Sequence, residues 1–148
     1  RLPVVLDSSS CSYSLKSSFD ALTTKNKEYF KSLQILDSIE FAYKYLIPNL
    51  KLKQTDDIVV LHPNCSVVKM NLQNQMYEIA KLCAKEVRIP INLGCCGFAG
   101  DRGFLYPELT HSATKPEAEE VLQINATEHY SSNVTCEICM STATEKKY

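Results

Sequence analysis

The stretch Ile58-Val59-Val60-Leu61-His62-Pro63-Asn64-Cys65 puts a wholly apolar run directly before a polar loop that carries a cysteine. The run is rich in β-branched residues, which suit a strand covered on both faces, and strands of that kind occur in parallel sheets. We therefore expect a buried parallel strand at Ile58–Leu61, with a loop leading to Cys65 at its carboxyl end.

Helical and strand-like segments alternate along the rest of the chain. Short strands are expected at Leu2–Leu6, at Val87–Leu93 and at Val134-Thr135, with Pro90 confining the second to an edge or an irregular strand. Apolar spacing predicts helices over Glu28–Leu46, about Val67–Lys85, and from a capping box at Thr114 and Glu117 to about Tyr130. This alternation predicts an α/β protein with a mostly parallel sheet flanked by helices.

Cysteines follow the predicted strands. Because parallel strands end at one edge of a sheet, where ligands of such folds collect, we expect these cysteines to gather at the carboxyl edge. They are Cys11, Cys65, Cys95, Cys96 and Cys136.

The cysteine pattern itself indicates metal chemistry. Cys136 and Cys139 form a Cys-x-x-Cys pair, which lets two thiolates hold one iron or zinc ion from a tight turn. The adjacent Cys95 and Cys96 can face different metal ions, and the glycines that follow let the backbone pass close to bulky sulfur atoms. Together with Cys65 these are more thiolates than one tetrahedral zinc needs, which favours an iron–sulfur cluster or a site with a spare redox-active thiol.

Composition restricts the function classes. The formal net charge is −1 with no block of basic residues, so nucleic acid is not an expected partner. The seven cysteines are an odd number, which is unusual for a secreted disulfide protein, although sequons at Asn64, Asn125 and Asn133 keep that alternative open. Reduced thiols in the cytoplasm more often bind metal or perform redox chemistry.

These motifs resemble the cysteine-rich CCG domain of heterodisulfide reductase and of the iron–sulfur subunits of glycolate oxidase and anaerobic glycerol-3-phosphate dehydrogenase. The chain is most similar to the C-terminal region of bacterial FAD-linked D-lactate or D-2-hydroxyacid dehydrogenases. The segments that carry the resemblance are His62–Ser66, Cys95–Gly103, Pro107–Thr110 and Thr135–Glu137.

The resemblance implies that residues 57–148 form one complete CCG repeat. Residues 1–56 would be the end of a preceding repeat plus a connecting helix, in a fragment of a longer protein. It also implies an iron–sulfur cluster of the 4Fe-4S type, with zinc as the alternative, and FAD in a missing N-terminal module. The implied ligands are Cys65, Cys95, Cys96, Cys136 and Cys139. From their own positions in the sequence, Cys11 is a further ligand candidate, and His62, Asp101 and Arg102 are candidates for supporting roles.

Two functional hypotheses follow from the resemblance. In the first, the chain passes electrons from flavin to a quinone or another acceptor, next to FAD-binding and ferredoxin-like modules of the same chain, and is inactive alone. In the second, it is a structural zinc-binding or docking module of the same oxidoreductase. Either would be cytoplasmic, or attached to the cytoplasmic face of a membrane.

Overall fold

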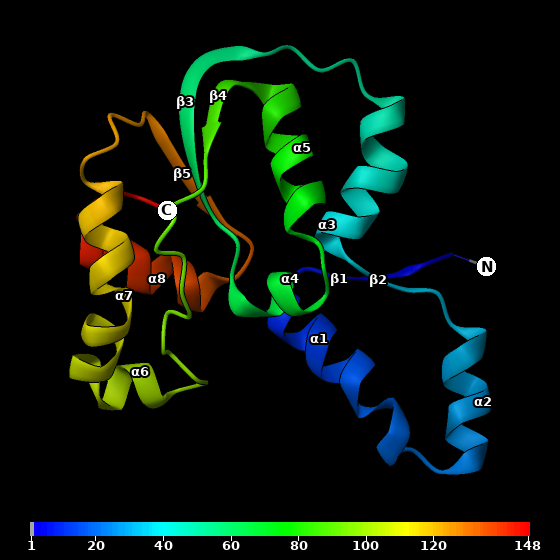
Figure 1. Ribbon diagram of the computed structural model, residues 1–148. Helices are drawn as coiled ribbons and strands as arrows, with labels where there is room; N and C mark the ends of the chain where they lie inside the picture. Colours follow the sequence, from blue (N-terminus) through cyan, green and yellow to red (C-terminus); the bar gives the residue numbers. More distant parts are fainter. Residues whose placement is uncertain (1) are drawn as a thin grey trace.

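The centre of the fold is a three-stranded parallel sheet, seen in the computed structural model, which describes residues 2–148 (Figure 1). Its strand order is β4-β3-β5, with β3 at Thr55–His62, β4 at Ala84–Arg88 and β5 at Glu128–Ser131. Both outer strands run parallel to β3. The chain is therefore an α/β protein with parallel sheets flanked by helices, as the sequence predicts.

Successive side chains of β3 point to opposite faces of the sheet, and helices cover both faces. Val59 and Leu61 join one buried cluster with Met76 of α5 (Gln73–Cys83). Val60 points the other way, into a cluster with Val121 of α7 (Pro107–Val121) and Met140 of α8 (Val134–Thr144). In Figure 1, α5 accordingly lies to one side of the strands, and α7 and α8 lie to the other. The wholly apolar run is thus explained by burial on both faces.

A smaller parallel sheet pairs β1 (Val4–Leu6) with β2 (Ile35–Asp37). The predicted helix over Glu28–Leu46 is wrong here, because β2 interrupts it. Asp37 starts a new helix after the strand: its Oδ1 accepts the Ile39 N–H at 2.9 Å, and Glu40 Oε2 accepts the Asp37 N–H at 2.9 Å. This capping box starts a helix in the middle of the segment for which the apolar spacing predicted one continuous helix. The helical elements in this part of the chain are α1 (Ser9–Ser17), η1 (Ser18–Ala21), α2 (Thr24–Ser32), α3 (Ser38–Phe41), the π-helix η2 (Ala42–Leu46) and η3 (Ile47–Asn49).

The predicted elements of the C-terminal half are also displaced. The helix expected from Thr114 begins earlier, at Pro107, where the fixed ring of proline suits a first helical position. The expected helix ran to about Tyr130, but its last residues belong to β5 (Glu128–Ser131). Val134-Thr135, expected as a strand, open α8. The short polar sequence of β5 carries no apolar run, so periodicity could not reveal it.

The middle of the chain needs two smaller corrections. The helix expected at 67–85 is divided into α4 (Cys65–Lys69) and α5, with Asn71 between them at a φ of 57°. The strand expected at Val87–Leu93 begins instead at Ala84 and ends at Arg88, before Pro90. Proline has no N–H to offer the ladder, so the strand stops short of it.

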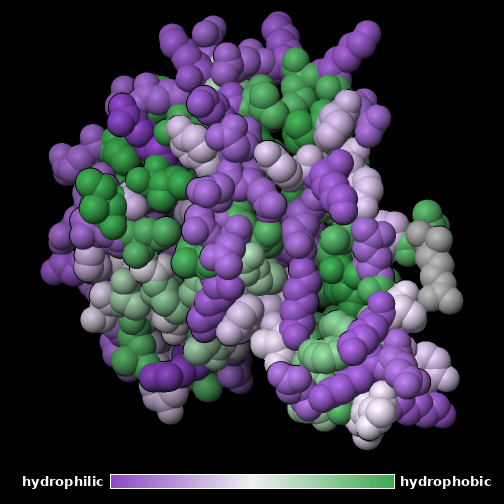
Figure 2. Space-filling view, turned by 45° about the vertical axis from the view of Figure 1, so that its right-hand side comes forward, coloured by the Kyte–Doolittle hydropathy of each residue, from purple (hydrophilic) through white to green (hydrophobic). Residues whose placement is uncertain are grey.

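The surface bears hydrophobic side chains in separate patches among hydrophilic ones on the face that Figure 2 shows. Within residues 2–148, no helix is long and apolar enough to cross a membrane.

Replacing Leu61 by alanine tests the role of β3. Leu61 is 2% exposed at the centre of the sheet, so Leu61→Ala should lower the free energy of unfolding by about 2–5 kcal/mol in urea denaturation. Leu82→Ala, at a leucine that is 46% exposed, is the matched control and should cost much less. Equal losses for the two variants would contradict the assignment of β3 as the core strand.

Candidate metal centre

The cysteines reach one region from three separate parts of the chain. Cys65 opens α4 after β3, Cys136 lies in the first turn of α8 after β5, and Cys95 and Cys96 lie in the loop that follows β4. All three segments leave the carboxyl edge of the parallel sheet, as the sequence predicts. The strand before Cys136, however, is β5 and not the segment expected at 134–135.

The start of α4 is fixed next to the start of α8. Asn64 caps α4: its Oδ1 accepts the backbone N–H groups of Ser66 at 3.0 Å and Val67 at 3.1 Å. The Nδ2 of the same side chain donates to Ser132 Oγ at 2.8 Å, just before α8. Asn64 is 1% exposed, which leaves no room for a sugar at this sequon.

The loop with the adjacent cysteines is held by two carboxylates of α7. Glu120 accepts the backbone N–H of Ile91 at 2.7 Å and that of Asn92 at 2.8 Å, while Glu117 Oε2 accepts the Gly94 N–H at 3.2 Å. These hydrogen bonds lower the pKa of Glu120, with the Asn92 N–H making the largest contribution. The segment directly before Cys95 is therefore anchored.

Beyond Cys96 the loop turns through left-handed backbone at Gly97, with a φ of 73°. A Cβ atom at Gly97 would meet the Ala113 side chain at 3.0 Å, so the turn brings the loop close to α7.

Cys65, Cys95, Cys96 and Cys136 line a single cavity of about 580 Å³. The other walls come from the β1–α1 turn, the glycine-rich loop and the start of α8. They are Asp7, Ser8, Ser10, Ser66, Phe98, Ala99, Gly100, Asn133, Val134 and Thr135. At this cavity the residue before α1 is joined to the residue before α8, because Ser8 Oγ donates a hydrogen bond to Asn133 Oδ1 at 3.1 Å.

Cys96 and Cys136 are in direct contact. Their Sγ atoms are 3.1 Å apart, both residues are buried, and all seven cysteines are free thiols. The contact between the two thiols lowers the pKa of Cys96 to about 6, whereas the same contact, together with burial, raises the pKa of Cys136. The contact therefore favours the loss of one proton from the pair and the retention of the other.

The remaining cysteines lie on either side of this pair. Cys65 and Cys95 line the cavity together, and burial, together with the neighbouring Cys65 thiol, raises the pKa of Cys95. Cys139 packs in the same buried cluster as Cys96 and Cys136, and burial raises the pKa of Cys139 to about 12. Cys65 and Cys95 are exposed, whereas Cys96, Cys136 and Cys139 are buried.

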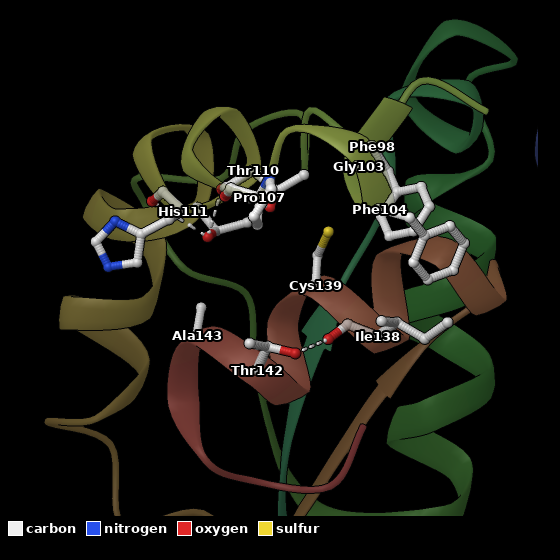
Figure 3. A pocket seen from close by; sticks show the side chains of 11 residues that line it. Phe98, Gly103, Phe104, Pro107, Thr110, His111, Ile138, Cys139, Thr142 and Ala143 are labelled. Carbon is white, nitrogen blue, oxygen red and sulfur yellow. Dashed lines mark hydrogen bonds between the residues drawn. The ribbon is translucent and has the colours of Figure 1, made fainter. Parts of the chain in front are cut away.

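Cys139 connects the cluster to a second cavity, of about 350 Å³, between α6 (Arg102–Leu105), α7 and α8. Figure 3 shows the Cys139 sulfur pointing into this space, with Phe98 and Phe104 at one end and His111 at the other. The two phenylalanine rings pack edge to face, with centroids 4.6 Å apart. The second cavity is thus mainly apolar.

A sulfur-bound metal at this cavity would require the thiols to move. Around a tetrahedral zinc with bonds of about 2.3 Å, sulfur atoms are about 3.8 Å apart, so the contact between Cys96 and Cys136 would widen on binding. Among residues 2–148, no three His, Cys, Asp or Glu side chains already stand as a group that could hold a metal ion. The cysteines around this common cavity nevertheless supply soft donors of the kind that iron and zinc take.

Other sequence candidates lie outside this cavity. Cys11 is exposed on α1, and Asp101 and Arg102 are exposed at the start of α6; none of the three lines the cavity. Cys83 ends α5 on the far side of β3, against the Met76 cluster, in keeping with a packing role. Sequence reasoning missed Glu117, which it had assigned to a helix cap, because its partner His62 lies 55 residues away.

No protein-family model and no curated protein matches this chain.

The shared proton can be tested in the reduced, metal-free chain. Ultraviolet thiolate absorbance should rise in a step near pH 6 as Cys96 ionises. In Cys136→Ala the donor to the thiolate is lost, so the pKa of Cys96 should increase and the step should move to higher pH. Cys96→Ser, as the control, should lack the step altogether. A step at the same pH in Cys136→Ala would contradict the pairing.

Proposed function

We propose that this chain is an iron–sulfur electron-transfer domain. Its cluster would be held by Cys65, Cys95, Cys96, Cys136 and Cys139. The observation that carries the proposal is that four of these thiols, from three separate segments at the carboxyl edge of one parallel sheet, line one cavity. Cys139 packs against Cys96 and Cys136 beside it. Packing alone does not explain why two exposed and two buried cysteines line the same cavity.

The donor set fits a cluster better than a single ion. A 4Fe-4S cluster takes four thiolates, and this region supplies five. One thiolate is already favoured at Cys96, so part of the proton loss that metal binding requires takes place before the metal arrives. When bound, such a cluster would accept and release electrons.

The protein's own residues give the site a closed side and an open side. The buried Cys96, Cys136 and Cys139 tie it to α8 and the core, and the exposed Cys65 and Cys95 face outward. An adjoining redox module could approach the exposed side closely without disturbing the core. This difference between a buried and an exposed side supports electron transfer over a purely structural role.

The sequence resemblance supports a more specific role. The domain would be the C-terminal cysteine-rich region of an FAD-linked D-lactate or D-2-hydroxyacid dehydrogenase, receiving electrons from flavin and passing them to a quinone or another acceptor. It would work beside FAD-binding and ferredoxin-like modules of the same chain, in the cytoplasm or at the cytoplasmic face of a membrane. By itself it would not oxidise a hydroxy acid.

Metal analysis of protein purified without oxygen tests the proposal. We expect iron and acid-labile sulfide in near-equal amounts, and loss of both by tenfold or more in Cys96→Ser. Cys83→Ser removes a cysteine from outside the cavity and should keep both. Zinc without sulfide in the wild-type protein would overturn the electron-transfer role and favour the structural zinc module, whereas equal iron content in all three proteins would contradict the assigned ligands.

A further inference from the structure

Two sulfur atoms of the cysteine cavity are closer than an ordinary non-bonded contact. The Cys96 and Cys136 Sγ atoms are 3.1 Å apart, whereas even carbon atoms, which are smaller, attract each other best at about 3.5–4.0 Å. Both thiols are free. A disulfide bond is about 2.05 Å long, so an approach of about 1 Å would bring the two atoms to bonding distance.

The backbone on each side keeps these two sulfur atoms together. Cys136 lies in the first turn of α8, where its N–H donates to the Asn133 carbonyl at 2.9 Å. Cys96 follows Gly94, whose N–H donates to the Glu117 carboxylate of α7 at 3.2 Å. Because folding has already placed the two thiols side by side, a reaction between them does not depend on a chance encounter.

Small molecules can reach the pair through the cysteine cavity. Cys96 and Cys136 are only 5% and 3% exposed, yet both line the cavity of about 580 Å³ that the exposed Cys65 and Cys95 also line. This volume far exceeds the share of about 30 Å³ that one water molecule has in the liquid, so a molecule of two oxygen atoms fits. Among the described residues of its walls, Asp7 is the one ionisable residue besides the cysteines, which suits a small uncharged molecule.

We propose that Cys96 and Cys136 form a peroxide-reactive dithiol, which hydrogen peroxide converts into a reversible disulfide when the chain holds no metal. One sulfur attacks the peroxide: the O–O bond breaks, an S–O bond forms, and one water leaves with the thiol proton. The second thiol then attacks the sulfenic acid: the S–S bond forms, the S–O bond breaks, and a second water leaves with the other proton. The two sulfur atoms together lose two electrons, and the peroxide is reduced to water.

The disulfide would close the sulfur site to metal. A metal binds deprotonated thiols, and a disulfide has none to offer. Of the proposed ligands only Cys65, Cys95 and Cys139 would remain, fewer than the four thiolates that a 4Fe-4S cluster takes. This consequence rests on the proposed function, whereas formation of the disulfide does not.

The first test is disulfide mapping of the reduced, metal-free chain after one equivalent of hydrogen peroxide. Trypsin releases the adjacent cysteines in peptide 89–102 and the Cys-x-x-Cys pair in peptide 103–146. The double variant Cys95→Ser/Cys139→Ser leaves one cysteine in each peptide, so a link between the peptides identifies the bonded pair. We expect this link in the wild type and in the double variant, with the intact mass lower by two hydrogen atoms, and we expect dithiothreitol to reverse it.

Single substitutions provide the controls for this mapping. Cys96→Ser and Cys136→Ser should each reduce the link by tenfold or more, whereas Cys83→Ser, outside the cavity, should keep it, with amide dispersion as the check on folding. A disulfide that joins Cys65 to Cys95 instead would overturn the proposal. Oxidation that stops at sulfinic or sulfonic acids, or no link in the double variant, would overturn it as well.

The second test compares anaerobic iron and sulfide loading, without added thiol, of the reduced and the peroxide-treated chain. The treated chain should bind tenfold less of both or lower, and prior reduction with dithiothreitol should restore them. Equal loading of the two forms would overturn the claim that the disulfide closes the site. A reduced chain that binds no iron would instead count against the proposed function, and the mapping would decide whether the dithiol forms its disulfide.

Discussion

Parallel pairing of β3 with β4 and β5 is the constraint on which the rest of the structure depends. Parallel strands end at the same edge, so the segments that follow them must begin side by side. In this chain those segments carry Cys65, the Cys95–Cys96 pair and Cys136. Covalent links are not needed to bring them together, because the backbone ladder and the two helical layers do so.

Helix α7 fixes the position of the loop that carries Cys95 and Cys96. Glu120 and Glu117 take the backbone donors that precede Cys95, so the loop that has no secondary structure of its own is held by charge-assisted hydrogen bonds. Glu117 in addition pairs with His62 at the end of β3. One buried carboxylate therefore links the central strand, the covering helix and the cysteine loop, and its loss would disturb all three.

The class of fold and the gathering of the cysteines could be predicted because their signals are local. A continuous β-branched run marks β3, and a cysteine after a strand marks the sheet edge. The strands β2 and β5 could not be found in this way: the first is three residues long inside helical spacing, and the second, Glu-His-Tyr-Ser, is held by pairing with β3. The roles of Glu117 and Thr114 were misread for a related reason. Both lie within α7, where the Thr114 hydroxyl donates to the Thr110 carbonyl at 2.8 Å, and only tertiary packing brings Glu117 to His62.

The central claim, that the thiols at this sheet edge hold one iron–sulfur centre, is tested most directly by X-ray absorption at the iron edge of the anaerobically loaded chain. The account predicts a first coordination shell of sulfur with further scattering from neighbouring iron, as thiolate-bound clusters have. A first shell of oxygen or nitrogen, with no neighbouring iron, would contradict it.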